Sequence, residues 1–163
     1  TLIIRFKTSD SMKSLVFISL LLLKLNSTVA QAHSTPPNFV KRYYEAYSGR
    51  PTALKLASFY SDSVVLDDPT FDWKGEGKET IFKNFDKSNE PNHYTWRVDQ
   101  VFEIKNTIIT EGELSATYKE IPYRMRFVNI FHFDEKGLII GQYDYFDNAD
   151  YYKAVNAARL LGK

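Results

Sequence analysis

The chain has no cysteine among its 163 residues, which excludes disulfide bonds and a thiol nucleophile. It has only three histidines, His33, His93 and His132, and their separations do not match those of a zinc site. The motifs of a serine-hydrolase elbow, a phosphate-binding loop and a dinucleotide fold are also missing. These absences predict chemistry that uses no metal and no cofactor.

A surplus of basic residues is missing too. Four of the 21 basic residues and one of the 20 acidic residues precede position 33, so 17 basic and 19 acidic residues follow. The net charge of 33–163 is therefore near −2. A nucleic-acid interface needs a basic patch, so we expect no nucleic acid among the partners.

Long apolar runs are scarce, and the main one, Leu15–Leu23, lies near the start of the sequence. It follows Met12-Lys13 and precedes the small-x-small pattern Ala30-Gln31-Ala32, an order typical of a secretory signal peptide. Its apolar core is too short to span a bilayer. We therefore expect upstream residues before Met12, a signal peptide over Met12–Ala32 with cleavage after Ala32, and one domain over 33–163 without a membrane span. Such a protein would be secreted or periplasmic.

The remaining sequence changes its periodicity near the middle. Apolar spacing predicts helices near 36–48, 52–60 and 78–87, with a strand over Val64–Asp68 and a loop over Pro69–Gly77. From Tyr94 the period becomes two, which predicts strands near 94–104, 107–119, 121–133 and 137–146, and then a helix near 148–161. This order is an α+β layout. A strongly curved, mostly antiparallel sheet wrapped over the N-terminal helices would enclose a pocket on its concave face.

Asp68 closes the short apolar run that starts at Val64. Alternate residues of a strand share a face, so Val64, Leu66 and Asp68 line up. A carboxylate at the end of an apolar row resists ionisation, and such a group can act as a base near neutral pH. The alternative is that Asp68 only begins the turn at Pro69, since Asp before Pro is a common turn signal.

Two further polar side chains interrupt apolar faces. Asn129 lies on a strand face with Tyr123, Met125, Phe127, Phe131 and Phe133. A buried amide without partners costs about 1–3 kcal/mol, so Asn129 either bonds to a neighbour in the core or faces a ligand cavity. Tyr43 lies in the apolar stripe of the first helix, as a core aromatic or as a phenol that takes part in a site.

The last strand carries a second polar pair. Ile140, Gln142, Asp144 and Phe146 are expected to share one face, and Ile139, Gly141, Tyr143 and Tyr145 the other. Gln142 and Asp144 are polar insertions between apolar residues. They belong either to a solvated face or to a ligand site.

Several short segments together resemble the SnoaL-like branch of the nuclear transport factor 2-like superfamily, over about 37–157. The segments are Arg42-Tyr43, Phe59-Tyr60-Ser61-Asp62-Ser63-Val64, Asp67-Asp68-Pro69, Gly75-Glu76-Gly77-Lys78-Glu79-Thr80-Ile81, Phe131-His132-Phe133 and Asp144-Tyr145-Phe146-Asp147. The resemblance implies a cone-shaped α+β barrel. The superfamily includes polyketide cyclases, ketosteroid isomerases, limonene epoxide hydrolases and scytalone dehydratases, together with many non-catalytic binding proteins.

Ketosteroid isomerases, which pair an Asp base with a Tyr and a protonated Asp, suggest roles for three residues. Asp68 takes the place of the base and Tyr43 that of the phenol that stabilises an oxyanion. Asn129 takes the place of the protonated Asp, and here the sequence departs from the pattern. The epoxide hydrolases have an Asp at the place of Asp144, but Thr110–Leu114 lacks their companion Arg and Asp.

Three functions remain open at this point. The first is an enzyme without a cofactor that acts on a small apolar carbonyl compound by isomerisation, cyclisation or dehydration, with Asp68, Tyr43 and Asn129 as catalytic residues. Its substrate contacts would come from Asp144, Gln142, Phe127, Phe131, Trp73 and Met125. The second is a periplasmic protein that binds the same ligand unchanged. The third is a homodimer used as an interaction module, formed through Val128, Ile130 and Tyr143.

Overall fold

The computed structural model describes residues 35–162, and six strands within them form one sheet in the order β2-β1-β6-β5-β4-β3. Neighbouring strands are antiparallel except β1 and β6, which are parallel. The predicted signal peptide and its cleavage site lie outside the described residues. The elements are α2 (Phe39–Tyr47), α3 (Ala53–Leu56), the 3-10 turn η1 (Ala57–Phe59), β1 (Tyr60–Asp68), the 3-10 turn η2 (Pro69–Phe71), β2 (Trp73–Glu76), α4 (Lys78–Phe82), α5 (Phe85–Asn89), β3 (Asn92–Ile104), β4 (Thr107–Tyr118), β5 (Ile121–Phe133), β6 (Ile139–Phe146) and α6 (Ala149–Leu160).

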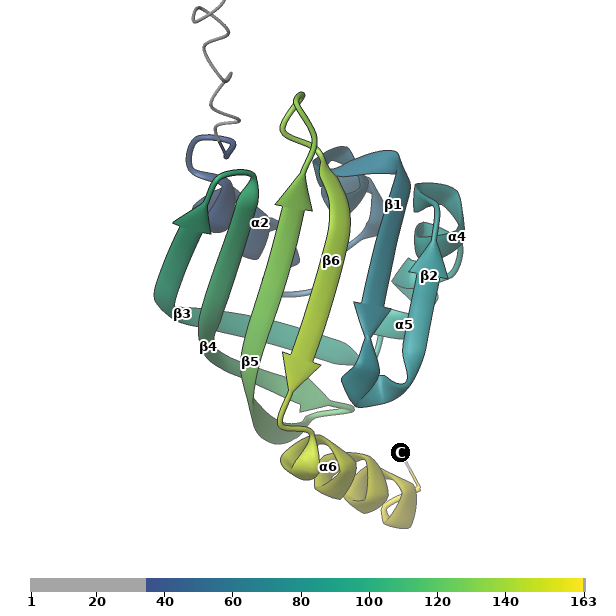
Figure 1. Cartoon of the computed structure of the whole chain (residues 1–163). Helices are drawn as coiled ribbons and strands as arrows, with labels where there is room; N and C mark the ends of the chain where they lie inside the picture. The colour runs from purple at the N-terminus through teal and green to yellow at the C-terminus, as the bar shows by residue number, and fades with distance from the viewer. Residues whose placement is uncertain (1–34, 163) are drawn as a thin grey trace, which may run out of the picture. The chain divides into compact units, whose positions relative to one another are not determined.

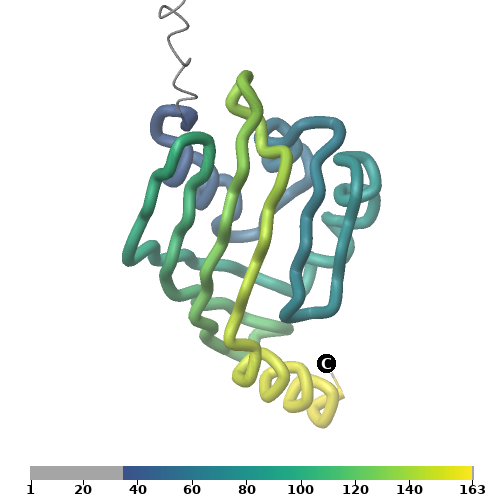
Figure 2. Tube along the Cα trace, in the orientation of Figure 1, coloured from purple at the N-terminus to yellow at the C-terminus, as the bar shows by residue number. Residues whose placement is uncertain are grey.

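The sheet curves around the helices that precede its long strands (Figures 1 and 2). In Figure 1, α2, α4 and α5 lie behind the sheet, and α6 crosses its lower end after β6. Across residues 35–162 the strand order leaves β2 and β3 at the two edges, so the cone is open and not a closed barrel. The predicted α+β class, with a strongly curved, mostly antiparallel sheet over N-terminal helices, is confirmed.

Strand β5 has the alternation that its sequence predicts. Its buried face carries Tyr123, Met125, Phe127, Asn129, Phe131 and Phe133. Phe39 and Tyr43 of α2 pack on Phe131, with ring centroids 5.0 and 4.9 Å apart. These aromatic contacts bury apolar area, which is the main stabilising contribution to the fold, and they hold α2 against the inner face of the sheet.

Local structure differs from the sequence prediction around β1. Residues Trp73–Glu76, predicted as part of a loop, form strand β2, because η2 reverses the chain and pairs them with Val65–Asp68. Strand β1 also begins earlier than predicted, at Tyr60. The helix predicted over 78–87 is divided into α4 and α5, because Asn84 leaves the helical conformation at ψ 15° and precedes α5.

A bulge in β6 overturns one predicted face. His132 pairs with Gly141 and Phe133 pairs with Ile139, so Ile140 has no partner in the ladder. The extra residue shifts the alternation, which leaves Ile139 fully buried and Ile140 38% exposed. The prediction that Ile140 shares a face with Gln142 and Asp144 is therefore wrong. The same shift directs the two polar side chains inward.

Gly112 of β4 lies where no larger residue fits. It pairs with Val98, next to a bulge in β3, and a Cβ added to it would collide with the Arg97 carbonyl oxygen and lie 2.8 Å from the Phe127 ring. We expect Gly112→Ala to lower the free energy of unfolding by about 1–3 kcal/mol, as overpacking does, and urea denaturation will measure the change. In the matched control, Gly141→Ala, the nearest contact is 3.4 Å, to the His132 ring. Equal stability of the two variants would contradict this explanation.

Candidate active site

A cavity of about 490 Å³, the large lobe, opens between β1, β6, α4 and α5. A second cavity of about 330 Å³, the small lobe, lies next to it on the side of β3, β4, β5 and α6. Both lobes are lined by Tyr47, Asp68, Ser88, Asn89 and Asp144. The two lobes therefore meet at a pair of carboxyl groups. The large lobe alone is within the size range of small-molecule sites.

Asp68 lies at the end of β1, where it begins the turn and also lines the cavity, so the prediction that it serves only the turn is too narrow. Its Oδ1 accepts a hydrogen bond of 3.3 Å from the Phe71 amide and so caps η2, while the side chain lines both lobes. Burial raises the pKa of Asp68 to about 6. The hydrogen bonds from the Phe71 and Thr70 amides oppose this shift, and the neighbouring charge of Asp67 adds to it. Asp68 is therefore a carboxylate of raised basicity at neutral pH.

Asp144 lies on the inner face of β6 and is only 8% exposed. Burial raises its pKa to about 8. The hydrogen bond from Gln142 opposes this shift, and the charge of Asp68 adds to it. The Gln142 Nε2 donates to Oδ1 at 3.0 Å and to Oδ2 at 2.7 Å. Asp144 is therefore mostly neutral at pH 7, when Asp68 is mostly ionised. One carboxyl group of the pair can accept a proton while the other donates a hydrogen bond.

Two phenols orient Gln142: Tyr60, which lines the large lobe, and Tyr43, which lies outside the lining of both lobes. The Tyr60 hydroxyl donates to Gln142 Oε1 at 2.6 Å, and the Tyr43 hydroxyl lies 2.8 Å from that of Tyr60 and 3.3 Å from the same Oε1. Burial raises the pKa of both phenols well above its usual range, so both keep their protons. Because Oε1 accepts from this side, the amide nitrogen must face Asp144. The chain Tyr43–Tyr60–Gln142–Asp144 thus fixes the position of one carboxyl group of the site.

The structure brings together part of the predicted site. Asp68, Gln142, Asp144 and Trp73 line the large lobe, and Met125 lines the small lobe. The other predicted residues are buried in the core and lie outside the lining of both lobes: Tyr43, Phe127, Asn129 and Phe131.

Asn129 is placed next to Asp144 in the sheet. The two residues are register partners on β5 and β6, a relation that brings Cβ atoms to roughly 5 Å of each other. The buried Asn129 Oδ1 has no hydrogen-bond donor among residues 35–162. Asn129 therefore places an unpaired buried acceptor next to Asp144 in the sheet.

Sequence reasoning missed Tyr60 and most of the residues that form the small lobe, although it named Asp68, Met125 and Asp144. Tyr60 was predicted to end a helix, so its side chain could not be assigned to the buried face of β1. The walls of the small lobe come from segments far apart in the chain, among them Leu114, Phe146 and Tyr151. Only their alternation in the strands could have indicated that the first two point inward.

No group of three or more His, Asp or Glu side chains with the arrangement of a metal site occurs in the described part of the chain. Over the same residues, the structure contains no helix that is both long enough and apolar enough to cross a membrane.

Solved structures share this fold. A protein assigned to the SnoaL-like polyketide cyclases from Shewanella denitrificans superposes with a TM-score of 0.63 at 17% identity, covering 72% of this chain and 94% of its own. A protein with a ketosteroid isomerase-like fold from Catenulispora acidiphila, in complex with trimethylamine, gives a TM-score of 0.64 at 13% identity, covering 74% of this chain and 93% of its own. An epoxide hydrolase of the limonene epoxide hydrolase-like type from Mycobacterium tuberculosis gives 0.60 at 15% identity over 76% and 93%. At these identities the likeness establishes the fold alone.

The structure therefore has the same class of α+β fold as these solved proteins. The sequence narrows this class, since residues 40–142 match the SnoaL-like domain family, and the chain is a member of that family. The resemblance predicted from the short segments is confirmed. No functionally curated protein matches the chain.

Proposed function

We propose that this protein is an enzyme that removes a proton from the carbon next to a carbonyl group in a small, mainly apolar compound. The observation that carries the proposal is the pair of carboxyl groups on one cavity, with pKa values of about 6 for Asp68 and about 8 for Asp144. Environments that push the pKa values of two such groups apart are typical of an acid and a base that work together.

In this mechanism, Asp68 accepts the proton from the α-carbon, and the electron pair of the broken C–H bond forms a carbon–carbon double bond. The carbonyl oxygen becomes an enolate oxygen, which neutral Asp144 stabilises by donating a hydrogen bond. Return of the proton from Asp68 to the same carbon gives exchange, and return to a conjugated carbon gives isomerisation. The enolate is also the intermediate that a cyclisation or a dehydration would use.

The roles first assigned to Tyr43 and Asn129 change in this proposal. Tyr43 acts through Tyr60 and Gln142, because its hydroxyl contacts those side chains and does not line the cavity. Asn129 acts through Asp144, its register partner. Both are therefore positioning residues, and the neutral acid of the site is Asp144, on the strand next to the one that carries Asn129.

Deuterium exchange tests the proposal without knowledge of the natural substrate. Phenylacetone, a small apolar ketone with acidic α-protons, is incubated with the protein in D2O, and incorporation at the α-carbon is followed by NMR. We expect the protein to accelerate exchange well beyond an equal concentration of acetate. Saturable binding of phenylacetone without acceleration would contradict the enzyme and support the alternative, a protein that holds its ligand unchanged.

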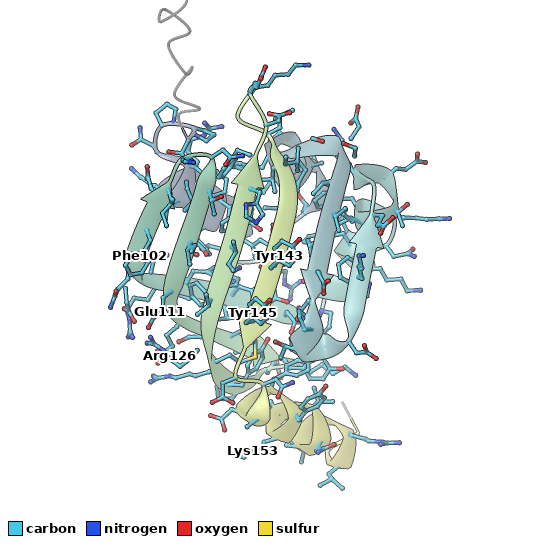
Figure 3. All side chains as sticks on the ribbon, in the orientation of Figure 1. Phe102, Glu111, Arg126, Tyr143, Tyr145 and Lys153 are labelled. Atoms are coloured by element: carbon cyan, nitrogen blue, oxygen red, sulfur yellow. The ribbon has the colours of Figure 1, made fainter. Side chains whose placement is uncertain are left out.

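The predicted homodimer concerns the opposite face of the sheet. Ile130 and Tyr143 are register partners there, beside the pair Val128 and Tyr145, and Figure 3 shows Tyr143 and Tyr145 on the face turned away from α2. We propose that a second copy packs on this face. Light scattering at micromolar concentration measures the mass, and a monomer at every concentration would contradict the dimer.

We also propose that the protein is secreted or periplasmic, on the strength of the sequence pattern over Met12–Ala32. Amino-terminal sequencing of the expressed protein tests this, and we expect the mature chain to begin at His33. A retained Met12–Ala32 segment would contradict cleavage.

A further inference from the structure

We propose that the substrate carries its reactive oxygen in the middle, with an apolar group on each side, and that it lies across the carboxyl pair with one end in each lobe. The inference rests on the proposed function, because it takes Asp68 and Asp144 as the reactive centre. It adds the shape and the class of the substrate, a compound of two apolar arms joined at a central ketone.

The arrangement of polar and apolar walls carries this inference. The lining that both lobes share is mostly polar: besides Tyr47 it consists of Asp68, Asp144, Ser88 and Asn89. Away from this junction each lobe also has apolar side chains in its walls, beside polar ones such as Asn84 in the large lobe and Asn92 in the small lobe. Those walls include Leu56, Ile81, Phe82 and Phe85 in the large lobe, and Phe71, Leu114, Met125 and Phe146 in the small lobe. A ligand with a reactive group at one end would leave one of these apolar spaces unfilled.

Helix α6 sets the length of the smaller arm. Tyr151 lines the small lobe, and its ring lies 5.3 Å from the rings of both Phe71 and Tyr123. These edge-on contacts hold Tyr151 as a wall. At about 330 Å³, the small lobe can hold a group the size of one aromatic ring, and the large lobe accepts a longer one.

Two ketones test the inference directly, because they differ by one arm. Dibenzyl ketone has a phenyl ring on each side of its carbonyl group, whereas phenylacetone has one ring and a methyl group. Burial of the second ring in an apolar lobe is worth on the order of 25 cal/mol per Å², so we expect dibenzyl ketone to bind at least tenfold more tightly in calorimetry. Equal affinities, or no detectable binding of dibenzyl ketone, would overturn the inference.

The two tryptophans of the chain report the lobes separately, since Trp73 lines the large lobe and Trp96 the small lobe. In Trp73→Phe the fluorescence comes from Trp96, and in Trp96→Phe it comes from Trp73. Dibenzyl ketone should change the emission of both single-tryptophan variants. A change in only one of them would mean that the ligand occupies one lobe, which overturns the inference.

A matched pair of variants fills one lobe at a time with the same residue. Met125→Phe narrows the small lobe and Leu66→Phe narrows the large lobe. We expect each substitution to lower the affinity for dibenzyl ketone at least tenfold. The affinity for phenylacetone should fall less than threefold, because its single ring can use the other lobe. Equal losses for both ketones would overturn the inference. All these measurements record binding, so a negative result in them counts against the two-armed ligand. The absence of deuterium exchange would instead count against the proposed function alone.

Discussion

Asp68→Asn is expected to lower the rate of α-proton exchange in phenylacetone by a factor of about 10²–10⁴, the range that a positioned general base contributes. The amide keeps the shape of the carboxylate and its oxygen can still accept from the Phe71 amide, so η2 should remain capped. What is lost is the basic group that burial has raised to a pKa of about 6. Binding of the ketone should change by less than the exchange rate does.

The neighbouring residue provides the control for this substitution. Asp67 precedes Asp68 on β1, so the two side chains lie on opposite faces of the strand. Asp67 is outside the lining of both lobes, although its charge contributes to the raised pKa of Asp68. Asp67→Asn therefore makes the same chemical change one position away, and it should alter exchange only by a small factor. If Asp67→Asn and Asp68→Asn reduced the rate equally, Asp68 could not be the base.

The sequence predicted those parts of the fold that depend on local periodicity. The long strands β3, β4 and β5 were found because alternation over many residues is a strong signal, and α2 because of its apolar stripe. Strand β2 was missed since four residues carry no period, and they become a strand only by pairing with β1. The bulge at Ile140 was missed for a similar reason, because its cause is the register with β5 and not the sequence of β6.

The candidate site shows the same division. Asp68, Gln142 and Asp144 could be identified because a polar residue in an apolar segment is a local feature. The raised pKa of Asp144 could not be predicted from the sequence, because it depends on burial by distant elements and on the charge of Asp68. Tyr43 was correctly seen as a phenol that needs a partner, yet its distance from the cavity follows from the position of Tyr60, which only the fold determines.

Replacing Asp144 should change the dependence of stability on pH. Its pKa of about 8 in the folded protein is above the value of about 3.9 in unfolded chains. Between these values the folded state holds a proton that the unfolded state has released, so the free energy of unfolding falls as pH rises. Asp68 contributes with the same sign only up to its pKa of about 6. The loss due to Asp144 is about 1.4 kcal/mol per pH unit near pH 6 and falls to about half of that at pH 8, where half of the folded molecules have released the proton.

Asp144→Asn should abolish the loss between pH 6 and pH 8 and reduce the change below pH 6 to the contribution of Asp68, because Asn stays neutral and Asp68 remains. Urea denaturation at several pH values measures the free energy of unfolding of the wild type and of the variant. Subtracting one from the other cancels the contributions of other groups that titrate in this range. Exchange activity should follow the same pair, rising through about pH 6 as Asp68 ionises and falling through about pH 8 as Asp144 does. Because the two charges interact, the apparent pKa values of the rise and of the fall describe the pair of carboxyl groups together and not either residue alone. A variant whose stability declined from pH 6 to pH 8 as steeply as the wild type would show that Asp144 is not the neutral acid of the site.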